Sequence, residues 1–295
     1  MLGLKKLALG LASITALGAF ASFSYAQQQA PPLSVKKLAD DVYWTQGGAG
    51  GNTGIIIGKD GVIVVDAKTT ADSAKQVLAE IAKLTPKPVT TVIITHSDAD
   101  HVNGLAAYPT GLTIISAEGC KKEMEASASS RNPAPQDHLP TKTVDKKETD
   151  TINGEKLVLI HTAPAHTSGD LQVFLPEQKI VFTGDVIAAN QAFTLIHAEK
   201  NGSSEGWVET VKVLTGLKAD TFVPGHGDLQ TKADVQARLD SVAARREQIK
   251  TLIAEGKTLP EIKQQLGEVD PPAGAPGPAF PSFTVVVYNE LVKKS

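Results

Sequence analysis

A run of two histidines and two aspartates directly follows an apolar, β-branched segment. Residues 89–95 have the composition of a strand buried on both faces, and they end at His96-Ser97-Asp98-Ala99-Asp100-His101. Neutral imidazoles and carboxylate oxygens are ligands that divalent metals bind in proteins. In an extended turn, residues 96 and 98 point the same way and residues 100 and 101 begin the next element, so one loop can serve two neighbouring ions. Taken alone, the stretch also suits a solvated acidic turn at a helix N-terminus.

Three later fragments supply residues of the same chemistry, each after a strand-like run. They are Ala165-His166-Thr167-Ser168-Gly169-Asp170, Phe182-Thr183-Gly184-Asp185 and Val223-Pro224-Gly225-His226-Gly227. A glycine beside a ligand lets the backbone come close and the side chain be aimed. Together with the first stretch, these fragments favour a metal site over a solvated turn.

The order and spacing of the four fragments resemble the metallo-β-lactamase-fold hydrolase superfamily. The motif of that family is His-x-His-x-Asp-His, followed by a His, a bridging Asp and a His between glycines. The resemblance runs from about residue 35 to residue 226. It implies an α/β fold, an αβ/βα four-layer sandwich of two mixed β-sheets flanked by helices, with the metals at one edge of the sheets.

The resemblance also implies a set of metal ligands. Metal 1 would be held by His96, Asp98 and His166, and metal 2 by Asp100, His101 and His226, with Asp185 bridging the two. Asp98 stands where the family has its second His, and a carboxylate there lowers the preference for zinc relative to manganese or iron. The expected cofactors are therefore two divalent ions, zinc first, with manganese or iron as alternatives. The other possibility is that Asp98 does not bind and only metal 2 is tight.

The resemblance implies a hydrolase acting on a small-molecule ester, lactone, thioester or amide. Two metals that share a water lower its pKa toward neutrality and hold hydroxide for attack. Asp100 would be the catalytic carboxylate that orients the nucleophile and passes its proton to the leaving group. His197 and Lys200 are candidates to contact substrate or to support the ligands.

Several other polar residues are expected to have structural roles. Asp66 is expected to buttress the metal loop, and Asp170 to accept hydrogen bonds within the His166 loop. His161 is expected to be structural and His138 to be solvated. Cys120 is expected to be buried or half-buried and unreactive, because no base adjoins it.

Three alternatives to this function remain open. A true β-lactamase commonly has a Cys and, three residues later, a Lys where this chain has Asp185 and Ala188. An iron-dependent redox enzyme of the same fold usually needs an electron donor, and no flavin domain follows. A degenerate metal-binding protein is the third, because one ligand departs from the pattern.

Residues 1–26 read as a secretory signal peptide, with Lys5 and Lys6 before an apolar run and Ser24-Tyr25-Ala26 before the cut. The expected organisation is a catalytic domain at 27–245 and a C-terminal helical extension with a Pro-rich linker at 246–295, in a secreted or periplasmic bacterial protein. No later stretch is apolar enough to span a bilayer.

A net charge of −3 gives no reason to expect nucleic acid as a partner, and one cysteine excludes an internal disulfide. The sequence does not set the oligomeric state.

Periodicity and turn residues predict strands interleaved with helices. Gly58-Lys59-Asp60-Gly61 and Asn153-Gly154 predict hairpins. A loop that could act as a lid is expected at 127–141, and a Val-rich segment of unassigned structure closes the chain. The strands are expected at 35–38, 42–45, 53–57, 62–66, 89–95, 112–116, 156–161, 171–175, 180–183 and 221–223, and the helices at 70–84, 117–126, 205–217, within 231–256 and at 259–266.

Overall fold

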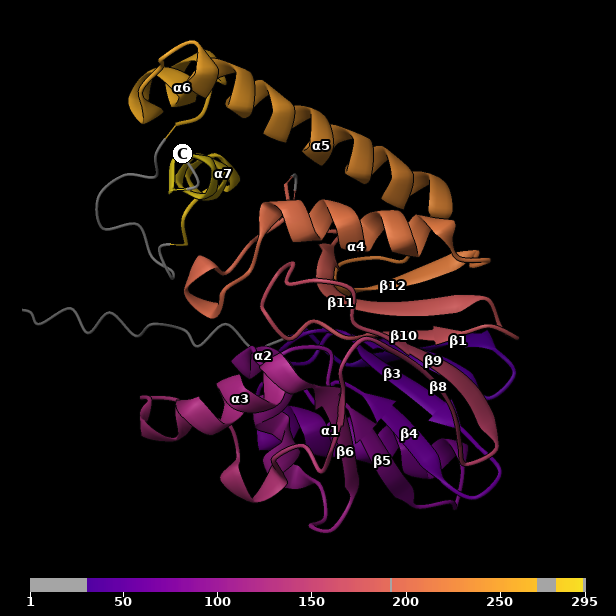
Figure 1. The fold of residues 1–295 in the computed structure, drawn as a ribbon. Helices are drawn as coiled ribbons and strands as arrows, with labels where there is room; N and C mark the ends of the chain where they lie inside the picture. The colour runs from indigo at the N-terminus through magenta and orange to yellow at the C-terminus, as the bar shows by residue number, and fades with distance from the viewer. Residues whose placement is uncertain (1–30, 192, 270–279, 294–295) are drawn as a thin grey trace, which may run out of the picture.

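Two β-sheets pack face to face, with helices on both outer faces. The computed structural model describes residues 31–191, 193–269 and 280–293. The strand order is β1-β2-β3-β4-β5-β6-β7 in one sheet and β13-β12-β11-β10-β9-β8 in the other. Figure 1 shows α1, α2 and α3 beside the first sheet and α4 and α5 above the second. The arrangement confirms the expected α/β sandwich of two mixed sheets flanked by helices.

The first sheet changes from antiparallel to parallel in its middle. Its strands β1 to β4 pair antiparallel, whereas β4 to β7 run parallel. The bounds are β1 Ser34–Ala39, β2 Val42–Gln46, β3 Thr53–Ile57, β4 Val62–Val65, β5 Val89–Ile93, β6 Thr113–Ala117 and β7 Lys142–Val144; the helices are α1 Ala71–Leu84, α2 Ala99–Val102 and α3 Glu118–Ala126.

The second sheet has one parallel pair, β11 and β12, and the rest of its pairs are antiparallel. Helix α4 makes the crossover between the two parallel strands. The bounds are β8 Lys147–Ile152, β9 Glu155–Ile160, β10 Gln172–Leu175, β11 Ile180–Ala188, β12 Thr221–His226 and β13 Gln230–Thr231; the helices are α4 Ser204–Gly216, α5 Lys232–Ala254, α6 Leu259–Gln265 and α7 Phe283–Lys293.

Local sequence explains where these elements begin and turn. Thr70 and Thr231 cap α1 and α5, each paired with the third residue of its helix in a reciprocal capping box. Asn153 and Gly154 have φ values of 52° and 85°, as the two-residue turn between β8 and β9 requires. The hairpin expected at 58–61 joins β3 to β4.

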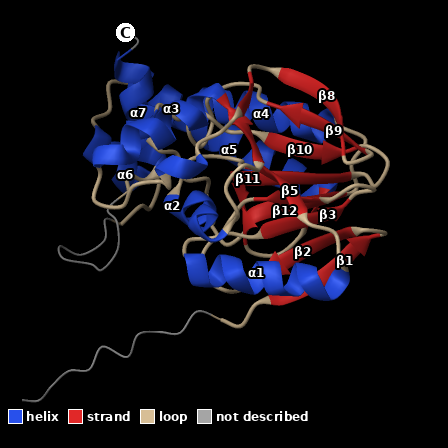
Figure 2. Ribbon diagram, turned by 90° about the horizontal axis from the view of Figure 1, so that it is seen from below, coloured by secondary structure: helices blue, strands red, loops and turns tan. Residues whose placement is uncertain are grey.

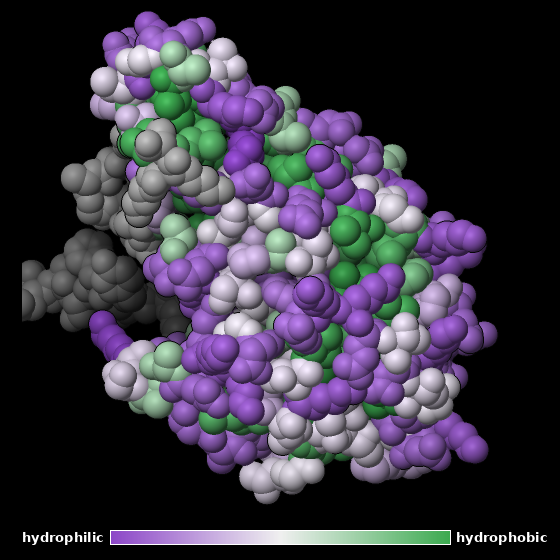
Figure 3. Space-filling model, viewed as in Figure 1, coloured by the Kyte–Doolittle hydropathy of each residue, from purple (hydrophilic) through white to green (hydrophobic). Residues whose placement is uncertain are grey.

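Three apolar layers hold the sandwich together. One lies between the sheets and includes Trp44, Leu159 and Phe182. A second joins the first sheet to α1 and α3, and the third joins the second sheet to the C-terminal helices. Figure 3 shows a mostly hydrophilic face, with hydrophobic side chains visible between α4 and α5 and around α6 and α7.

The C-terminal region shares its core with the second sheet. Helix α5 runs without a break across the expected domain boundary at 245/246. Ile249, Ile262 and Val287 belong to the same apolar layer as Trp207 of α4 and Phe222 of β12. Within the described residues, the extension is therefore packed against the sandwich.

Some expectations about elements need correction. Strand β11 continues past 183 to Ala188, so Asp185 lies within a strand. The strands β7 and β13 and the helix α7 are not among the expected elements. The 127–141 segment contains two short 3-10 turns before β7. The expectation that His138 is solvated is wrong: its side chain is buried, and Nε2 lies 3.0 Å from the carbonyl oxygen of Tyr108.

The predicted signal peptide, residues 1–26, and most of the Pro-rich linker lie outside the described residues. None of the helices that the structure describes combines the length and apolar character needed to cross a bilayer.

Candidate metal centre

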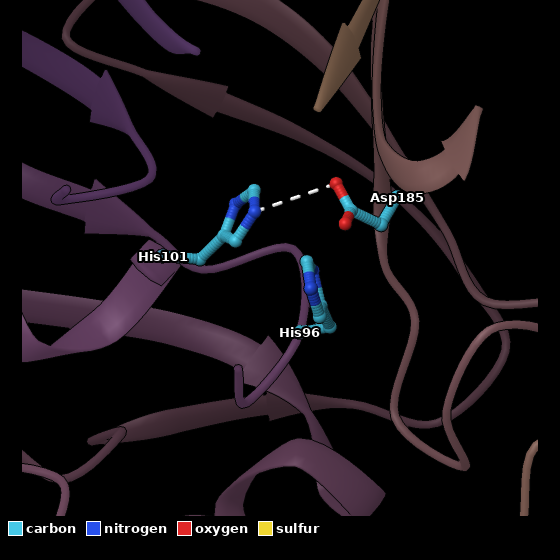
Figure 4. A group of neighbouring side chains, drawn as sticks. All are labelled: His96, His101 and Asp185. Atoms are coloured by element: carbon cyan, nitrogen blue, oxygen red, sulfur yellow. Dashed lines mark ion pairs between the residues drawn. The ribbon is translucent and has the colours of Figure 1, made fainter. Parts of the chain in front are cut away.

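The seven expected ligands meet at one edge of the sandwich. His96 to His101 follow β5, His166 follows β9, Asp185 lies on β11 and His226 ends β12. The structure brings their ligand atoms into three groups, within each of which all atoms lie within 4.8 Å of one another: His96, His101 and Asp185; His96, Asp98 and His166; Asp100, His101 and His226. Figure 4 shows the first group, with His101 and Asp185 facing each other from the two halves of the fold.

Two of these groups correspond to the two expected sets of ligands. In one, Asp98 Oδ2 lies 3.1 Å from His166 Nε2 and 3.7 Å from His96 Nε2. In the other, Asp100 Oδ2 lies 3.0 Å from His226 Nε2 and 3.7 Å from His101 Nε2. Each group therefore offers two imidazoles and one carboxylate to a common point.

Asp185 reaches both groups. Its Oδ1 lies 3.4 Å from His101 Nε2, and its Oδ2 lies 3.4 Å from His226 Nε2 and 4.0 Å from His166 Nε2. The preceding residue, Gly184, has a φ of 54°, a backbone conformation that favours glycine. This geometry suits a carboxylate that bridges two ions.

The outward nitrogens of the imidazoles are held by neighbouring groups. His101 Nδ1 lies 2.8 Å from Asp66 Oδ2, His96 Nδ1 lies 3.0 Å from Thr95 Oγ1, and His166 Nδ1 lies 2.9 Å from the Leu195 carbonyl oxygen. Such contacts fix the ring and leave Nε2 for a metal. Asp66 thus buttresses the metal loop, as expected.

The donor set fits a pair of divalent ions. His96 Nε2 is buried and has no hydrogen-bond partner among the described residues, which a coordinated ion would satisfy. The centre combines four imidazoles with three carboxylates, and no thiol takes part. Ligands of this kind suit zinc, manganese and iron.

A family model described as the metallo-beta-lactamase superfamily matches residues 47–226, which include every one of these ligands. The chain belongs to the metallo-β-lactamase superfamily. The expected family is confirmed.

Relatives in the superfamily include different enzymes. The chain is 28% identical over 173 residues to the 2,4-dinitroanisole O-demethylase subunit alpha of Nocardioides sp. strain JS1661, covering 58% of this chain and 51% of the relative. It is 24% identical over 213 residues to the linear primary-alkylsulfatase of Pseudomonas sp. strain ATCC 19151, covering 57% of this chain and 40% of the relative. The chain thus spans about half the length, or less, of these curated relatives.

A solved metallo-β-lactamase from Pontibacter korlensis shares the fold. The TM-score is 0.62 at 21% sequence identity, and the match covers 72% of this chain and 99% of the other. The fold expected for the superfamily is thus confirmed by a solved structure as well as by the sheet order.

In this member of the superfamily, the Asp at the second motif position is paired with a lysine. Lys200 Nζ lies 2.5 Å from Asp98 Oδ1 and 2.9 Å from Ser97 Oγ. Ser97 donates to Glu123 Oε2 at 2.5 Å, and Ser168 donates to Glu123 Oε1 at 2.6 Å. Asp98 therefore keeps Oδ2 toward the imidazoles, while Lys200 occupies its other oxygen.

Charges within the centre hold the carboxylates ionised. Burial alone would raise the pKa of Asp98, but the hydrogen bond from His166 and the nearby His96 and Lys200 hold that pKa well below its usual range. Burial likewise opposes the ionisation of Asp185, whose pKa is also low because it faces His101 and His226. Both carboxylates are therefore anionic at neutral pH, as metal ligands must be.

The glycine-rich loop at 47–52 packs against the second ligand group. The Gly51 N–H donates to the Asp100 carbonyl oxygen at 3.1 Å, and a Cβ on Gly51 would lie 2.3 Å from His101 Cε1. The buried Lys68 donates to the Gly51 and Gly47 carbonyl oxygens at 2.6 and 2.9 Å. Asn52 Nδ2 donates to the carbonyl oxygens of Pro224 and Gly227, both at 2.9 Å, on either side of His226.

Sequence reasoning missed Lys68, Asn52 and Glu123. A lysine two residues beyond the expected end of an apolar strand was the available signal for Lys68. Nothing local marks Asn52 or Glu123, because their partners lie far along the chain.

The remaining candidates have structural surroundings. Asp170 accepts from the Thr167 N–H and hydroxyl, and His161 Nδ1 lies 2.8 Å from the Asp170 carbonyl oxygen. Both match their expected roles. Cys120 is buried, and burial raises the pKa of its thiol, so it is unreactive as expected.

His197 lies beside the first ligand group. Its Nε2 is 3.5 Å from Asp98 Oδ2, and its ring centre is 4.6 Å from that of His166. Burial lowers the pKa of His197, which keeps the ring neutral at neutral pH. The ring can therefore support Asp98 or contact a substrate.

Proposed function

We propose that this chain is an exported, dinuclear metal-dependent hydrolase that cleaves an ester, lactone, thioester or amide bond of a small molecule. The observation that carries the proposal is the pair of nitrogen- and oxygen-donor groups joined by Asp185. His96, Asp98 and His166 would hold one ion, and Asp100, His101 and His226 the other. Divalent ions bound there supply Lewis acidity, which lowers the pKa of water toward neutrality and polarises a carbonyl oxygen.

Asp100 is the residue placed to move a proton. Its side chain is 36% exposed, whereas that of Asp185 is 11% exposed, so Asp100 reaches furthest toward solvent. Burial raises its pKa, but His101 and His226 hold that pKa at about 2, so the carboxylate is ionised. An ionised carboxylate at the rim can orient a nucleophile and carry its proton to the leaving group.

Lys200 is placed to tune the first ligand group. Its ammonium neutralises part of the charge that Asp98 adds in place of an imidazole. Its side chain is 28% exposed, so it also faces the space from which a substrate approaches.

A substrate panel on protein with measured metal content tests the proposal. The panel holds esters, lactones, thioesters, amides, a β-lactam and an alkyl sulfate, the last because a relative is an alkylsulfatase. We expect zinc or manganese near two equivalents and turnover of a carbonyl substrate. Iron with visible absorbance would favour the redox alternative, turnover of only the β-lactam would favour a β-lactamase, and no bound metal would favour the degenerate protein.

Two substitutions separate the roles of the carboxylates. Asp98→Ala should remove about one metal equivalent by elemental analysis; unchanged stoichiometry would contradict its role as a ligand.

Asp100→Asn should lower kcat about 10²- to 10⁴-fold. The matched control is Asp137→Asn, since that side chain is 72% exposed and lies outside the centre.

Export is tested separately by N-terminal sequencing of the protein recovered from the periplasm or the medium of bacterial cells. The mature chain should begin near Gln27. An intact Met1 on the recovered protein would overturn the signal-peptide prediction.

A further inference from the structure

A cavity of about 720 Å³ lies beside the metal centre, in a part of the fold that the ligands do not use. It is lined by the loop after β11, by α5, by the end of α6 and by the start of α7. Figures 1 and 2 both place α6 and α7 at the same end of the molecule as α2, which carries Asp100 and His101. Small-molecule sites in proteins have volumes of about 300–1,000 Å³.

Two contacts join the lining of this cavity to the metal centre. The Leu195 carbonyl oxygen, in the loop after β11, lies 2.9 Å from His166 Nδ1. The centre of the Phe280 ring, in the segment just before α7, lies 4.5 Å from the centre of the His197 ring. Because His197 also packs on His166, the cavity is one side chain away from the first ligand group.

The interior is aromatic, with a cation beside it. Phe193 and Phe283 stack with their ring centres 6.0 Å apart and their planes 11° apart. The guanidinium of Arg245 lies 4.8 Å from the centre of the Phe193 ring. Arg245 forms no ion pair with any residue that the structure describes, and the lining also includes one lysine and one glutamate, so cations exceed anions by one.

Aromatic walls beside a guanidinium that has no ion pair among the described residues favour an amphipathic anion as the ligand of this cavity. Apolar surface gains free energy by leaving water, and the aromatic walls supply that surface. A guanidinium binds a carboxylate or sulfate through two parallel hydrogen bonds, and a cation held over an aromatic face is already oriented for such a contact. A neutral apolar ligand would leave the charge of Arg245 without a partner.

We propose that this cavity binds the non-reacting part of the substrate, an apolar chain or ring that ends in a carboxylate or sulfate held by Arg245. The reacting bond then lies at the metal centre, on the other side of His197. The link to catalysis rests on the proposed function, whereas binding of the anion does not.

Binding is measured on the metal-loaded protein by isothermal titration calorimetry with three probes of one chain length. They are octanoate, octan-1-ol and octyltrimethylammonium. We expect saturable binding of octanoate that is at least tenfold tighter than that of the other two. Equal affinity for the three, or no saturable binding of octanoate, would overturn the proposal.

Variants separate this cavity from the metal centre, where a carboxylate can also bind. Arg245→Met should weaken octanoate binding at least tenfold. Arg245→Lys keeps the charge but not the planar pair of donors, so it should restore only part of the loss. Lys250→Met is the matched control, since it removes one charge from the same helix at a side chain that is 57% exposed, and it should change nothing. Octanoate binding that survives Arg245→Met would place the carboxylate elsewhere and overturn the proposal.

A second variant fills the cavity without touching a charge. Leu266→Trp should abolish octanoate binding while metal content and melting temperature stay close to those of the unaltered protein. If that variant does not fold, the Arg245 pair still decides the question, because Arg245 is half-buried and makes no ion pair with the described residues.

Kinetics distinguish this proposal from the proposed function. For an ester with an anionic tail, Arg245→Met should raise KM about tenfold and leave kcat unchanged, with no effect on a short neutral ester. If octanoate binding depends on Arg245 but no substrate is turned over, the proposed hydrolase function is contradicted and the anion-binding proposal stands. If esters are turned over but neither octanoate binding nor KM depends on Arg245, the anion-binding proposal is overturned and the hydrolase function stands.

Discussion

The imidazole of His166 binds a proton at the place where a metal ion would bind. Burial lowers its pKa, but the hydrogen bond to Asp98 and the nearby carboxylates of Asp185 and Asp170 raise that pKa to about 9. His101 also has a raised pKa, because Asp185, Asp66 and Asp100 surround it. In the ion-free protein these rings therefore hold protons at neutral pH, and a metal displaces them.

Metal affinity should consequently rise with pH. Each proton displaced makes the apparent association constant rise about tenfold per pH unit below the pKa of the group that holds it. Between pH 6 and pH 8 we expect at least that slope for zinc, measured by competition with a chelator whose own pH dependence is known.

The control for this slope is His161→Gln, since His161 lies outside the ligand groups and contacts the Asp170 carbonyl oxygen. It should leave the slope unchanged. A zinc affinity that is flat from pH 6 to pH 8 would show that His166 and His101 are already neutral in the ion-free protein.

At the level of single residues, the sequence predicts the expected ligands better than it predicts the side chains that hold the surrounding loops. The seven expected ligands follow a motif, and the structure brings their side chains together. Lys68 and Asn52 act on carbonyl oxygens of distant segments, and no local pattern encodes such partners. His138 looked solvated in a polar loop, yet it is buried because its ring meets the Tyr108 carbonyl oxygen.

The ammonium group of Lys68 holds the glycine-rich loop at 47–52 in place. Lys68 has a φ of 71° and directs its ammonium under the loop, against the carbonyl oxygens of Gly47 and Gly51. Burial lowers the pKa of Lys68 from 10.5 to about 8, although Asp66 and Asp100 act in the opposite direction. The folded protein therefore releases this proton at a lower pH than the unfolded chain does.

This difference predicts a particular pH dependence of stability. Between pH 8 and pH 10.5 the unfolded chain binds more protons at Lys68 than the folded protein does, so this group makes the free energy of unfolding rise with pH. Relative to Lys68→Met, the unaltered protein should gain up to about 3 kcal/mol across this window.

The two proteins are compared by urea denaturation at matched pH, so that other alkaline titrations cancel. Below pH 8 the difference between them should be constant. Parallel stability curves up to pH 10.5 would mean that the pKa of Lys68 is not shifted.

Periodicity predicted elements such as α1, whose buried residues Ala74, Val77 and Ile81 recur at helical spacing. Helix α7 was missed because its run of three β-branched valines is typical of a strand, whereas packing against α5 makes the segment helical. Strand β7 is three residues long and carries too little pattern to predict. Strand β11 was expected to end at residue 183, but it continues to Ala188 through Gly184, which has a positive φ within the strand.

On the scale of the whole molecule, α7 is joined to α4 by a carboxylate. Glu290 accepts the Ser204 N–H at 2.8 Å at the first turn of α4, and it also accepts the Ser204 hydroxyl. A negative charge at a helix N-terminus is favourable, and hydrogen bonds to charged groups are strong. Arg246 of α5 donates to the same hydroxyl at 3.1 Å, so three helices meet at Ser204.

Glu290→Ala should therefore lower the free energy of unfolding by about 1.5–3 kcal/mol, since it leaves the α4 N-terminus without this partner. Urea denaturation measures the change. Asn289→Ala is the matched control, because Asn289 is the exposed neighbour on the same helix. An equal effect of the two substitutions would show that α7 is held by its apolar face alone.

The expected ligands are divided between the two sheets. His96 to His101 follow a strand of the first sheet, whereas His166, Asp185 and His226 lie on or after strands of the second. A chain that has folded only its first half can offer an ion part of each ligand group and no bridge. The complete set exists only after the sheets have docked, so an ion that binds it adds RT ln(1 + [ion]/Kd) to the stability of that docking. A filled centre would then indicate that the two sheets have docked. In a cell that withholds metal, the same protein would lack this contribution to its stability, and a larger fraction of it would be undocked.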